Sequence, residues 1–261
     1  MAQAKGAFVS DEVLLERRGR TLIITINRPE ARNAFNLAVA QGLADAVDEL
    51  DDTPELSVAI ITGAGGNFCA GMDLKAFMAG EVPAIEGRGI GFTERPPRKP
   101  LIAAVEGYAL AGGTEIVLAT DLIVAAKNAK FGIPEVKRGL VAAGGGLLRL
   151  QKRIPYQKAL ELALTGDSFT AEEASAWGFV NVLTEPGEAL AGALALAERI
   201  TANGPLAVAV TKEVMTKSAD WTEAEMWKKQ GELVFPVFSS KDAMEGATAF
   251  AEKRKPNWTG T

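Results

Sequence analysis

Residues 100–115, PLIAAVEGYALAGGTE, combine a short apolar strand, a glycine turn and the start of a helix. The run Leu101 to Glu106 predicts a buried strand, and Gly112 and Gly113 allow the backbone to turn sharply into a helix. The unpaired N–H groups and the dipole of that helix make its first turn electropositive. Glu115 lies three residues after Gly112, on the same side of the turn. The stretch therefore places a carboxylate beside free backbone donors.

A second glycine turn follows another buried strand earlier in the chain. Residues 57–62 (SVAIIT) predict the strand, and residues 68–74 (FCAGMDL) contain the turn. If the N–H groups of both turns point at one spot, they supply the two donors that an oxyanion hole needs. In the alternative, Glu115 only complements the helix dipole and the glycines only allow close packing. Spacing alone leaves both interpretations open.

A third segment, residues 131–139 (FGIPEVKRG), places Glu135 after a proline at the end of a predicted strand. The glycine-rich run Ala142 to Gly146 follows and predicts another helix start. Taken alone, the segment favours a surface loop in which Glu135 pairs with Lys137 or Arg138.

The chain contains no histidine. A Ser-His-Asp or Cys-His device is therefore excluded, and the usual zinc sites lack their main nitrogen ligand, so we expect no metal. Proton transfer near neutral pH falls to carboxylates, lysine, tyrosine or water. Because a free glutamate titrates near pH ~4.3, it needs burial to act as an acid or base at neutral pH. Buried glutamates are therefore the candidates for catalysis.

Composition also narrows the class of protein. The net charge is -5 and no long run of lysine or arginine occurs, so we expect no nucleic-acid partner. The longest apolar runs are too short to span a bilayer. Residues 1–10 (MAQAKGAFVS) have no apolar signal core and Cys69 is the only cysteine, which predicts a cytoplasmic protein without an intramolecular disulfide. Phe68 replaces the third glycine of a dinucleotide-binding pattern that would begin at Gly63, so we expect neither a nicotinamide nor a flavin cofactor.

The chain divides into two parts by its patterning. The first part predicts strands and glycine turns that repeat with helices, the strands at 21–27, 57–62, 101–106 and 122–126 and a helix from Leu37 with Asn36 as its cap. Residues 80–100, rich in glycine, proline and charge, predict a mobile loop or partly helical lid. From Pro155 onward alanine-rich amphipathic stretches predict helices at 156–164, 171–177, 188–202, 206–217 and 222–234, interrupted by a strand at 179–183. We expect an α/β core followed by a helical C-terminal region.

In this order, the phrases resemble the crotonase, or enoyl-CoA hydratase/isomerase, superfamily, and are most like its bacterial enoyl-CoA hydratases. The resemblance runs from Arg20 to Trp258 and rests on NRP at 27–29 with Asn33-Ala34, FCAGMDL, PLIAAVEGYALAGGTE, FGIPE, GGG at 144–146, LTG at 164–166 and FAEKRKP at 250–256. It implies a ClpP-like ββα superhelix over residues 1–200. Residues 201–261 would form a helical trimerisation region, giving a homotrimer or a hexamer made of two trimers.

The resemblance also implies roles for particular residues. The thioester oxygen would sit between the backbone N–H groups of Met72 and Gly112. Glu115 would orient and deprotonate the water that attacks C3 of a trans-2-enoyl thioester, and Glu135 would exchange the proton at C2. The implied CoA-binding residues are Ala31, Ala70, Asp73, Leu74, Lys75 and Lys253, the last reaching a CoA phosphate in a neighbouring subunit. For Lys253 a solvated cation at a helix end is an equal alternative.

The implied reaction is the reversible syn addition of water to a trans-2-enoyl-CoA, giving a 3-hydroxyacyl-CoA, in fatty-acid or related acyl-CoA degradation. The CoA belongs to the substrate and no further cofactor is implied. Two alternatives remain, a double-bond isomerase and a non-catalytic acyl-CoA-binding regulator, but two carboxylates favour hydration because isomerases of this family usually keep one acidic group. Ala142-Ala143 replaces the Pro-Gly of many hydratases, which leaves substrate choice and efficiency open.

Overall fold

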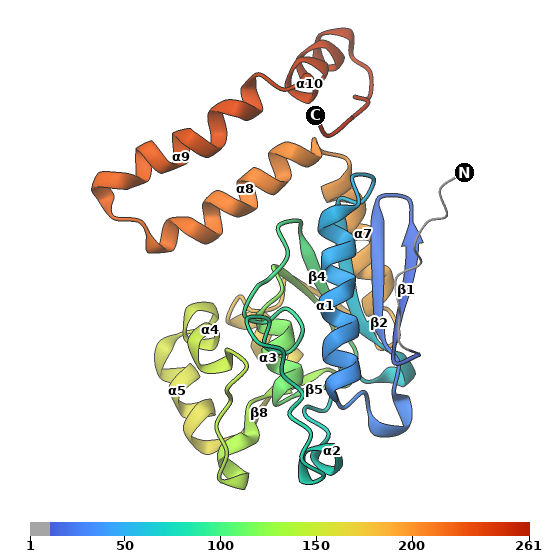
Figure 1. Cartoon of the computed structure of the whole chain (residues 1–261), viewed down its shortest axis with the longest axis vertical. Helices are drawn as coiled ribbons and strands as arrows, with labels where there is room; N and C mark the ends of the chain where they lie inside the picture. Colours follow the sequence, from blue (N-terminus) through green and yellow to red (C-terminus); the bar gives the residue numbers. More distant parts are fainter. Residues whose placement is uncertain (1–10) are drawn as a thin grey trace.

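The computed structural model describes residues 11–261, and the segment 1–10, for which the sequence predicts no signal core, lies outside the described residues. A six-stranded sheet with the order β1-β2-β3-β4-β6-β9 forms the centre of the molecule (Figure 1). Within this sheet only the β1–β2 pair is antiparallel. The strands are β1 Val13–Arg18, β2 Thr21–Ile26, β3 Val58–Gly63, β4 Leu101–Val105, β6 Leu122–Ala126 and β9 Val182–Thr184.

A second, three-stranded sheet lies beside the first and has the order β5-β7-β8. Its strands are β5 Tyr108–Leu110, β7 Lys130–Gly132 and β8 Ser168–Thr170. The chain passes from β4 into β5 and from β6 into β7, so it visits the large sheet and then the small one in successive turns. In the preceding turn, Cys69 joins the small sheet through a parallel bridge to Ala109. The expected α/β fold of repeated strand, turn and helix is confirmed.

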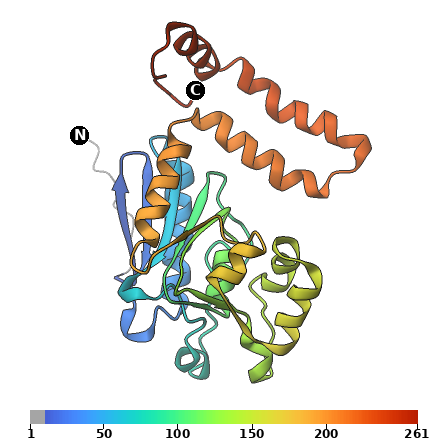
Figure 2. The same ribbon diagram turned by 180° about the vertical axis from the view of Figure 1, so that it is seen from behind.

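Two helices cover the opposite faces of the large sheet. Helix α1 (Leu37–Asp52) buries Val39, Leu43, Val47 and Leu50, and its cap is confirmed because Asn36 Oδ1 accepts the Val39 N–H at 2.9 Å. Helix α7 (Ala189–Thr201) covers the other face, as the second view also shows (Figure 2). Its buried residues are alanines at every fourth position, 189, 193 and 197, and their small size lets the helix approach the strands closely.

Shorter helices surround the small sheet and one edge of the large one. They are α2 Leu74–Met78, α3 Gly112–Leu118, α4 Gly146–Arg153, α5 Tyr156–Thr165 and α6 Ala171–Ala176, with 3-10 turns η1 Pro29–Ala31, η2 Ala64–Gly66 and η3 Pro134–Arg138. The expected helix starts at Gly112 and after Gly144 are confirmed. None of the helices within residues 11–261 has the length and apolar character that a membrane crossing requires.

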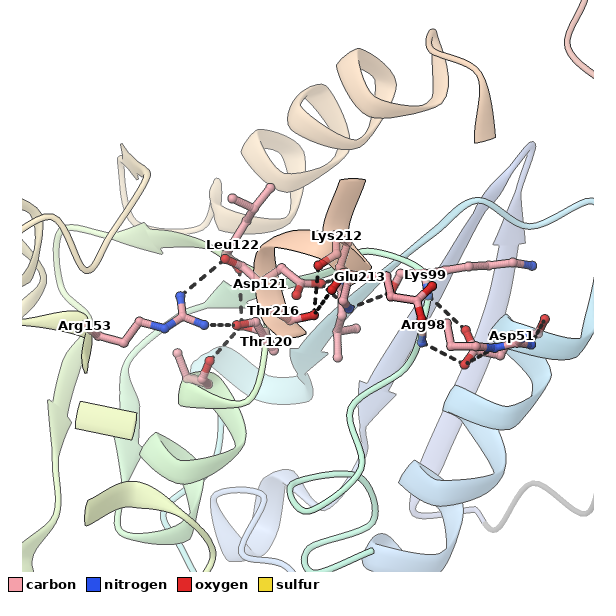
Figure 3. A network of polar contacts seen from close by, with 12 residues as sticks. Asp51, Arg98, Lys99, Thr120, Asp121, Leu122, Arg153, Lys212, Glu213 and Thr216 are labelled. Atoms are coloured by element: carbon pink, nitrogen blue, oxygen red, sulfur yellow. Dashed lines mark hydrogen bonds and ion pairs between the residues drawn. The ribbon is translucent and has the colours of Figure 1, made fainter. Parts of the chain in front are cut away.

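The last three helices project from the sheets as an arm (Figure 1). They are α8 Pro205–Lys217, α9 Glu223–Phe238 and α10 Lys241–Glu252, with the 3-10 turn η4 Ser218–Asp220 between the first two. The sequence did not predict α10. Near the base of the arm, Lys212 donates to the Lys99 carbonyl at 2.9 Å and pairs with Asp121 at 2.6 Å (Figure 3). Arg153 of α4 joins the same network through the Thr120 carbonyl at 2.8 Å.

Residues 80–100 form a loop, one of the two expected alternatives, and the other, a partly helical lid, was wrong. These residues form no helix, and Ile90, Phe92 and Thr93 are at most 5% exposed. Four glycines and four prolines within this segment disfavour a continued helix, while the apolar side chains drive part of the loop into the core. The segment 90–93 is therefore a wall of the core.

The Asn33 side chain links the chain at Arg28 to residues 64–67, which precede the glycine turn at Gly71. Asn33 is fully buried at φ 57°, and its amide donates to the Ala64 and Asn67 carbonyls and accepts the Arg28 N–H. We expect Asn33→Ala to lower the free energy of unfolding by about 2–4 kcal/mol, because it leaves buried polar groups without partners. Denaturant unfolding measures the loss. Asn36→Ala, which removes one cap, should cost about 1 kcal/mol. An equal loss of unfolding free energy in Asn33→Ala and Asn36→Ala would contradict the larger contribution expected of the Asn33 hydrogen bonds.

Candidate active site

A cavity of about 380 Å³ opens between the glycine turns, α2, η3 and the loop before α4. It brings together Glu115, Glu135, Met72, Gly112, Ala70 and Leu74, which the sequence analysis had selected. Most of the remaining lining is apolar and includes Phe35, Phe77, Ile90, Leu140 and Val141. Charged side chains from separate segments are thus enclosed by apolar ones, where electrostatic interactions are strong.

The two glycine turns lie against each other at this cavity. Cys69 N–H donates to the Tyr108 carbonyl at 2.9 Å, and Leu110 N–H donates to the Cys69 carbonyl at 3.0 Å. At the next contact, a Cβ on Gly71 would lie only 2.8 Å from the Ala111 Cβ and 3.1 Å from the Leu110 carbonyl oxygen. Gly71 also has a φ of 104°. Glycine is therefore required there, both for the backbone angle and for the close approach.

Met72 and Gly112 line this cavity from the two turns. Met72 forms a parallel bridge with Phe35, in which the Phe35 N–H donates to the Gly71 carbonyl and the Asp73 N–H donates to the Phe35 carbonyl, each at 2.9 Å. Since N–H groups alternate in direction along extended backbone, the Met72 N–H points away from Phe35. Gly112 is the first residue of α3, so its N–H has no acceptor within the helix. These two N–H groups therefore take no part in the hydrogen bonds of the bridge or of the helix.

Glu115 is a buried carboxylate, 4% exposed, in the first turn of α3. Its Oε1 accepts the Gly146 N–H at 2.9 Å. Burial raises the pKa of Glu115 to about 7, and the neighbouring Glu135 adds to this effect, while the Gly146 and Gly144 N–H groups and Arg149 oppose it. At neutral pH the group can therefore either take up or release a proton.

Glu135 reaches the same cavity from η3, not directly from a strand end. It is half-buried, and its Oε2 is buried without a hydrogen-bond partner among residues 11–261. Burial raises the pKa of Glu135, and the nearby Arg138 opposes the rise. Lys137 pairs with Asp167 at 2.7 Å. The free oxygen leaves Glu135 able to contact a ligand or water in the cavity.

Gly144 and Gly146, at the start of α4, leave the space that the Glu115 carboxylate occupies. A Cβ on Gly144 would lie 2.8 Å from Glu115 Oε2, and one on Gly146 would lie 3.0 Å from Oε1. Alanine stands where there is more room: Ala143 lines the cavity and is exposed. The replacement of Pro-Gly by Ala142-Ala143 therefore places a methyl-bearing residue in the cavity wall without touching the positions that Glu115 occupies.

Four of the selected residues, Ala31, Asp73, Lys75 and Lys253, do not line the cavity. The Asp73 carboxylate instead caps α2 through the Lys75 and Ala76 N–H groups and pairs with Arg28 at 3.0 Å. Lys253 is exposed at the end of α10, on the arm and far from α2 (Figure 1).

The sequence did not identify which individual loop residues line the cavity. Ile90, Glu94, Arg138 and Val141 line it, although no local pattern distinguishes them. Arg149, which approaches Glu115 from α4, was also missed. Within residues 11–261, no group of three or more His, Cys, Asp or Glu side chains is arranged to hold a metal ion.

Comparisons with known proteins agree with this geometry. The family model described as Enoyl-CoA hydratase/isomerase matches residues 16–261. The enoyl-CoA hydratase EchA19 of Mycobacterium tuberculosis is 46% identical, with 95% of this chain and 96% of that protein covered. A carnitinyl-CoA dehydratase of Salmonella arizonae is 43% identical, with 97% and 100% covered. The crystal structure of an enoyl-CoA hydratase from Mycobacterium tuberculosis H37Rv has a TM-score of 0.95 and 67% identity, with 97% and 100% covered.

Burial of Glu115 gives stability a defined dependence on pH. Its pKa is raised to about 7 in the folded chain, so the folded state holds its proton more tightly than the unfolded state. The resulting stability is complete below about pH 4.5 and is lost as the pH rises through about 7. We expect the free energy of unfolding of Glu115→Gln, taken relative to that of the parent chain, to rise by about 2–3 kcal/mol from pH 5 to pH 8.

Denaturant unfolding at several pH values measures this difference. Glu30→Gln, at an exposed glutamate, is the matched control and should follow the parent chain throughout. A difference that stays constant from pH 5 to pH 8 in Glu115→Gln would contradict the raised pKa.

Proposed function

This chain belongs to the enoyl-CoA hydratase/isomerase family, and on that premise we propose that it hydrates trans-2-enoyl-CoA thioesters to 3-hydroxyacyl-CoA. It is then a carbon–oxygen hydro-lyase. The observation that carries the proposal is the meeting of two carboxylates with raised pKa, Glu115 and Glu135, and two backbone donors at one cavity. In such a set one carboxyl group can deprotonate a water that attacks one carbon, and the other can exchange a proton at the neighbouring carbon. The backbone donors meanwhile stabilise charge on the thioester oxygen.

In the proposed reaction the thioester oxygen accepts hydrogen bonds from the Met72 and Gly112 N–H groups. The ionised Glu115 takes a proton from water as the water oxygen bonds to C3. The electrons of the double bond move toward C2 and the thioester oxygen, where the two N–H dipoles stabilise the charge. Glu135, whose pKa burial raises, delivers a proton to C2. One water is consumed, and proton exchange through solvent restores both carboxyls.

The CoA part of the substrate would pass along the Met72 side of the cavity. Ala70 and Leu74 line the cavity there, and the Ala70 N–H donates to the Arg32 carbonyl at 3.0 Å, which brings the turn at Ala31 beside them. Asp73 and Lys75 would contribute through their backbone, since the Asp73 side chain is already engaged with Arg28. Lys253 would reach a CoA phosphate of a neighbouring subunit. No cofactor besides this CoA takes part in the proposed chemistry.

We place the reaction in fatty-acid or related acyl-CoA degradation in the cytoplasm. The test is loss of the ultraviolet absorbance of the conjugated enoyl thioester over a panel of acyl groups from crotonyl upward. The panel also includes carnitinyl-CoA, whose dehydration would raise this absorbance, because a relative at 43% identity is named a carnitinyl-CoA dehydratase. We expect hydration by the parent chain and by Glu30→Gln, and a loss of about 10²–10⁴-fold in kcat for Glu115→Gln and for Glu135→Gln.

Two outcomes would replace this proposal. A gain of absorbance with a 3-enoyl-CoA, with Glu135 alone essential, would identify an isomerase. Binding of CoA esters without conversion of any member of the panel would identify an acyl-CoA-binding regulator.

We also propose that the arm formed by α8, α9 and α10 joins subunits into a homotrimer or a hexamer. The arm exposes large apolar side chains that a single chain leaves in water, namely Met215, Trp227, Phe235, Phe238, Met244 and Phe250, each at least 67% exposed. Contact with a neighbouring chain would bury them. The expected boundary between core and arm, at residue 200, stays a prediction.

Analytical ultracentrifugation tests the assembly. We expect a mass of three or six chains of 27.5 kDa for the parent protein. Phe235→Glu should give smaller species, because a buried charge without a partner is costly. Met78→Glu, an equally exposed apolar position on α2, is the control and should leave the mass unchanged. A parent protein that sediments as a single chain would refute the assembly.

A further inference from the structure

Arg149 of α4 is half-buried beside the cavity and outside the set of residues assigned above. Its Nη2 donates to the Thr93 carbonyl. Thr93 is fully buried, and its Oγ1 accepts the Ile90 N–H at 3.0 Å. Ile90 in turn lines the cavity. Arg149 therefore holds the segment 90–93, which forms part of the cavity wall, against α4.

The same guanidinium lies over the loop that binds Glu115. A Cβ on Gly145 would lie 2.2 Å from Arg149 Nη1, so the side chain passes directly above that glycine. The next residue, Gly146, donates its N–H to Glu115 at 2.9 Å. On the other side of the loop, a Cβ on Gly144 would meet Ile90 Cδ1 and Glu115 Oε2, each at 2.8 Å. Arg149 thus contacts both the segment 90–93 and the glycine loop 144–146. Ile90 of that segment packs against Gly144, and Gly144 and Gly146 pack against Glu115.

Charge gives this contact a second consequence. Burying a guanidinium is costly unless it is compensated, and within residues 11–261 Arg149 has no carboxylate within ion-pair distance. Glu115 is close enough for the two charges to interact, each favouring the ionised form of the other. The other charged groups that act at these two side chains are Glu135 from η3, which disfavours the ionised Glu115, and Arg153 of α4, which disfavours the charge on Arg149.

We propose that Arg149 is a positioning residue that couples the cavity wall at Ile90–Thr93 to the Glu115 carboxylate. An acyl group that fits against Ile90 thereby meets a glutamate held in its reactive place, and one that displaces the wall disturbs the loop carrying Gly146. This inference rests on the proposed function only in taking Glu115 as the group that acts on water.

The test compares Arg149→Met, which keeps an unbranched apolar stem, with Arg149→Lys, which keeps the positive charge. We expect Arg149→Met to lower kcat/KM about 10–100-fold and to move the acidic limb of its pH profile upward by about 0.5–1 unit, because Glu115 loses an opposite charge. Arg149→Lys should keep the limb at the parent position. Deuterium exchange of the amides in residues 88–94 should accelerate in Arg149→Met, where the bond to Thr93 is lost.

Arg153→Met is the matched control, since Arg153 lies on the same helix but donates to the Thr120 carbonyl at 2.8 Å. It should alter neither the acidic limb nor exchange at residues 88–94. A purely structural role would lower the melting temperature of Arg149→Met while the acidic limb stays in place, and that result would overturn the proposal.

Failure of the proposed function is separable from failure of this inference. If the parent chain converts no enoyl thioester, the carboxyl resonance of Glu115, identified in carbon-13 NMR by its absence from Glu115→Gln, replaces the pH–rate profile. Its titration midpoint should still rise in Arg149→Met and stay in place in Arg153→Met. An unchanged midpoint, or unchanged exchange at residues 88–94, would refute the coupling whatever the reaction is.

Discussion

The hydrogen bond from the Gly146 N–H to the Glu115 carboxylate organises the candidate active site. It joins the first turn of α3 to the first turn of α4, and it keeps a carboxylate in an apolar cavity where burial raises its pKa to about 7. Backbone donors stabilise the charged form without adding a competing ionisable group. A side chain at residue 144 or 146 would occupy the space of the carboxylate, so the glycines and the glutamate depend on each other.

The fold supplies this arrangement by visiting two sheets in turn. Each pass through the large sheet continues into the small one and then into a helix or 3-10 turn, so Met72, Gly112 and Glu135 reach the cavity from successive passes. The backbone around Met72 and Gly112 is therefore held in place by hydrogen bonds of its neighbours. The network around Asp121 and Lys212 ties the arm to the same core (Figure 3).

Much of the local structure was predictable from particular residues. The strand at 122–126, the cap at Asn36 and the helix start at Gly112 follow from apolar runs, a capping amide and glycine chemistry, which act over a few residues. The segment 80–100 was not predictable in the same way. Its glycines and prolines indicated a break in helical structure, but burial of Ile90, Phe92 and Thr93 depends on α1 and α4, which lie elsewhere in the chain.

The sequence by itself determined which groups could carry out acid–base chemistry, because the absence of histidine left carboxylates as the main candidates. It also determined where the glycine turns lie and, through its resemblance to a family, which residues are candidates for the site. Only the tertiary structure decided that Glu135 is half-buried with a free oxygen, that residues 90–93 form a wall and that Arg149 lies over the loop that holds Glu115. Burial and proximity depend on residues far apart in the chain, such as Glu115 and Gly146, which are 31 positions apart. No local pattern specifies them.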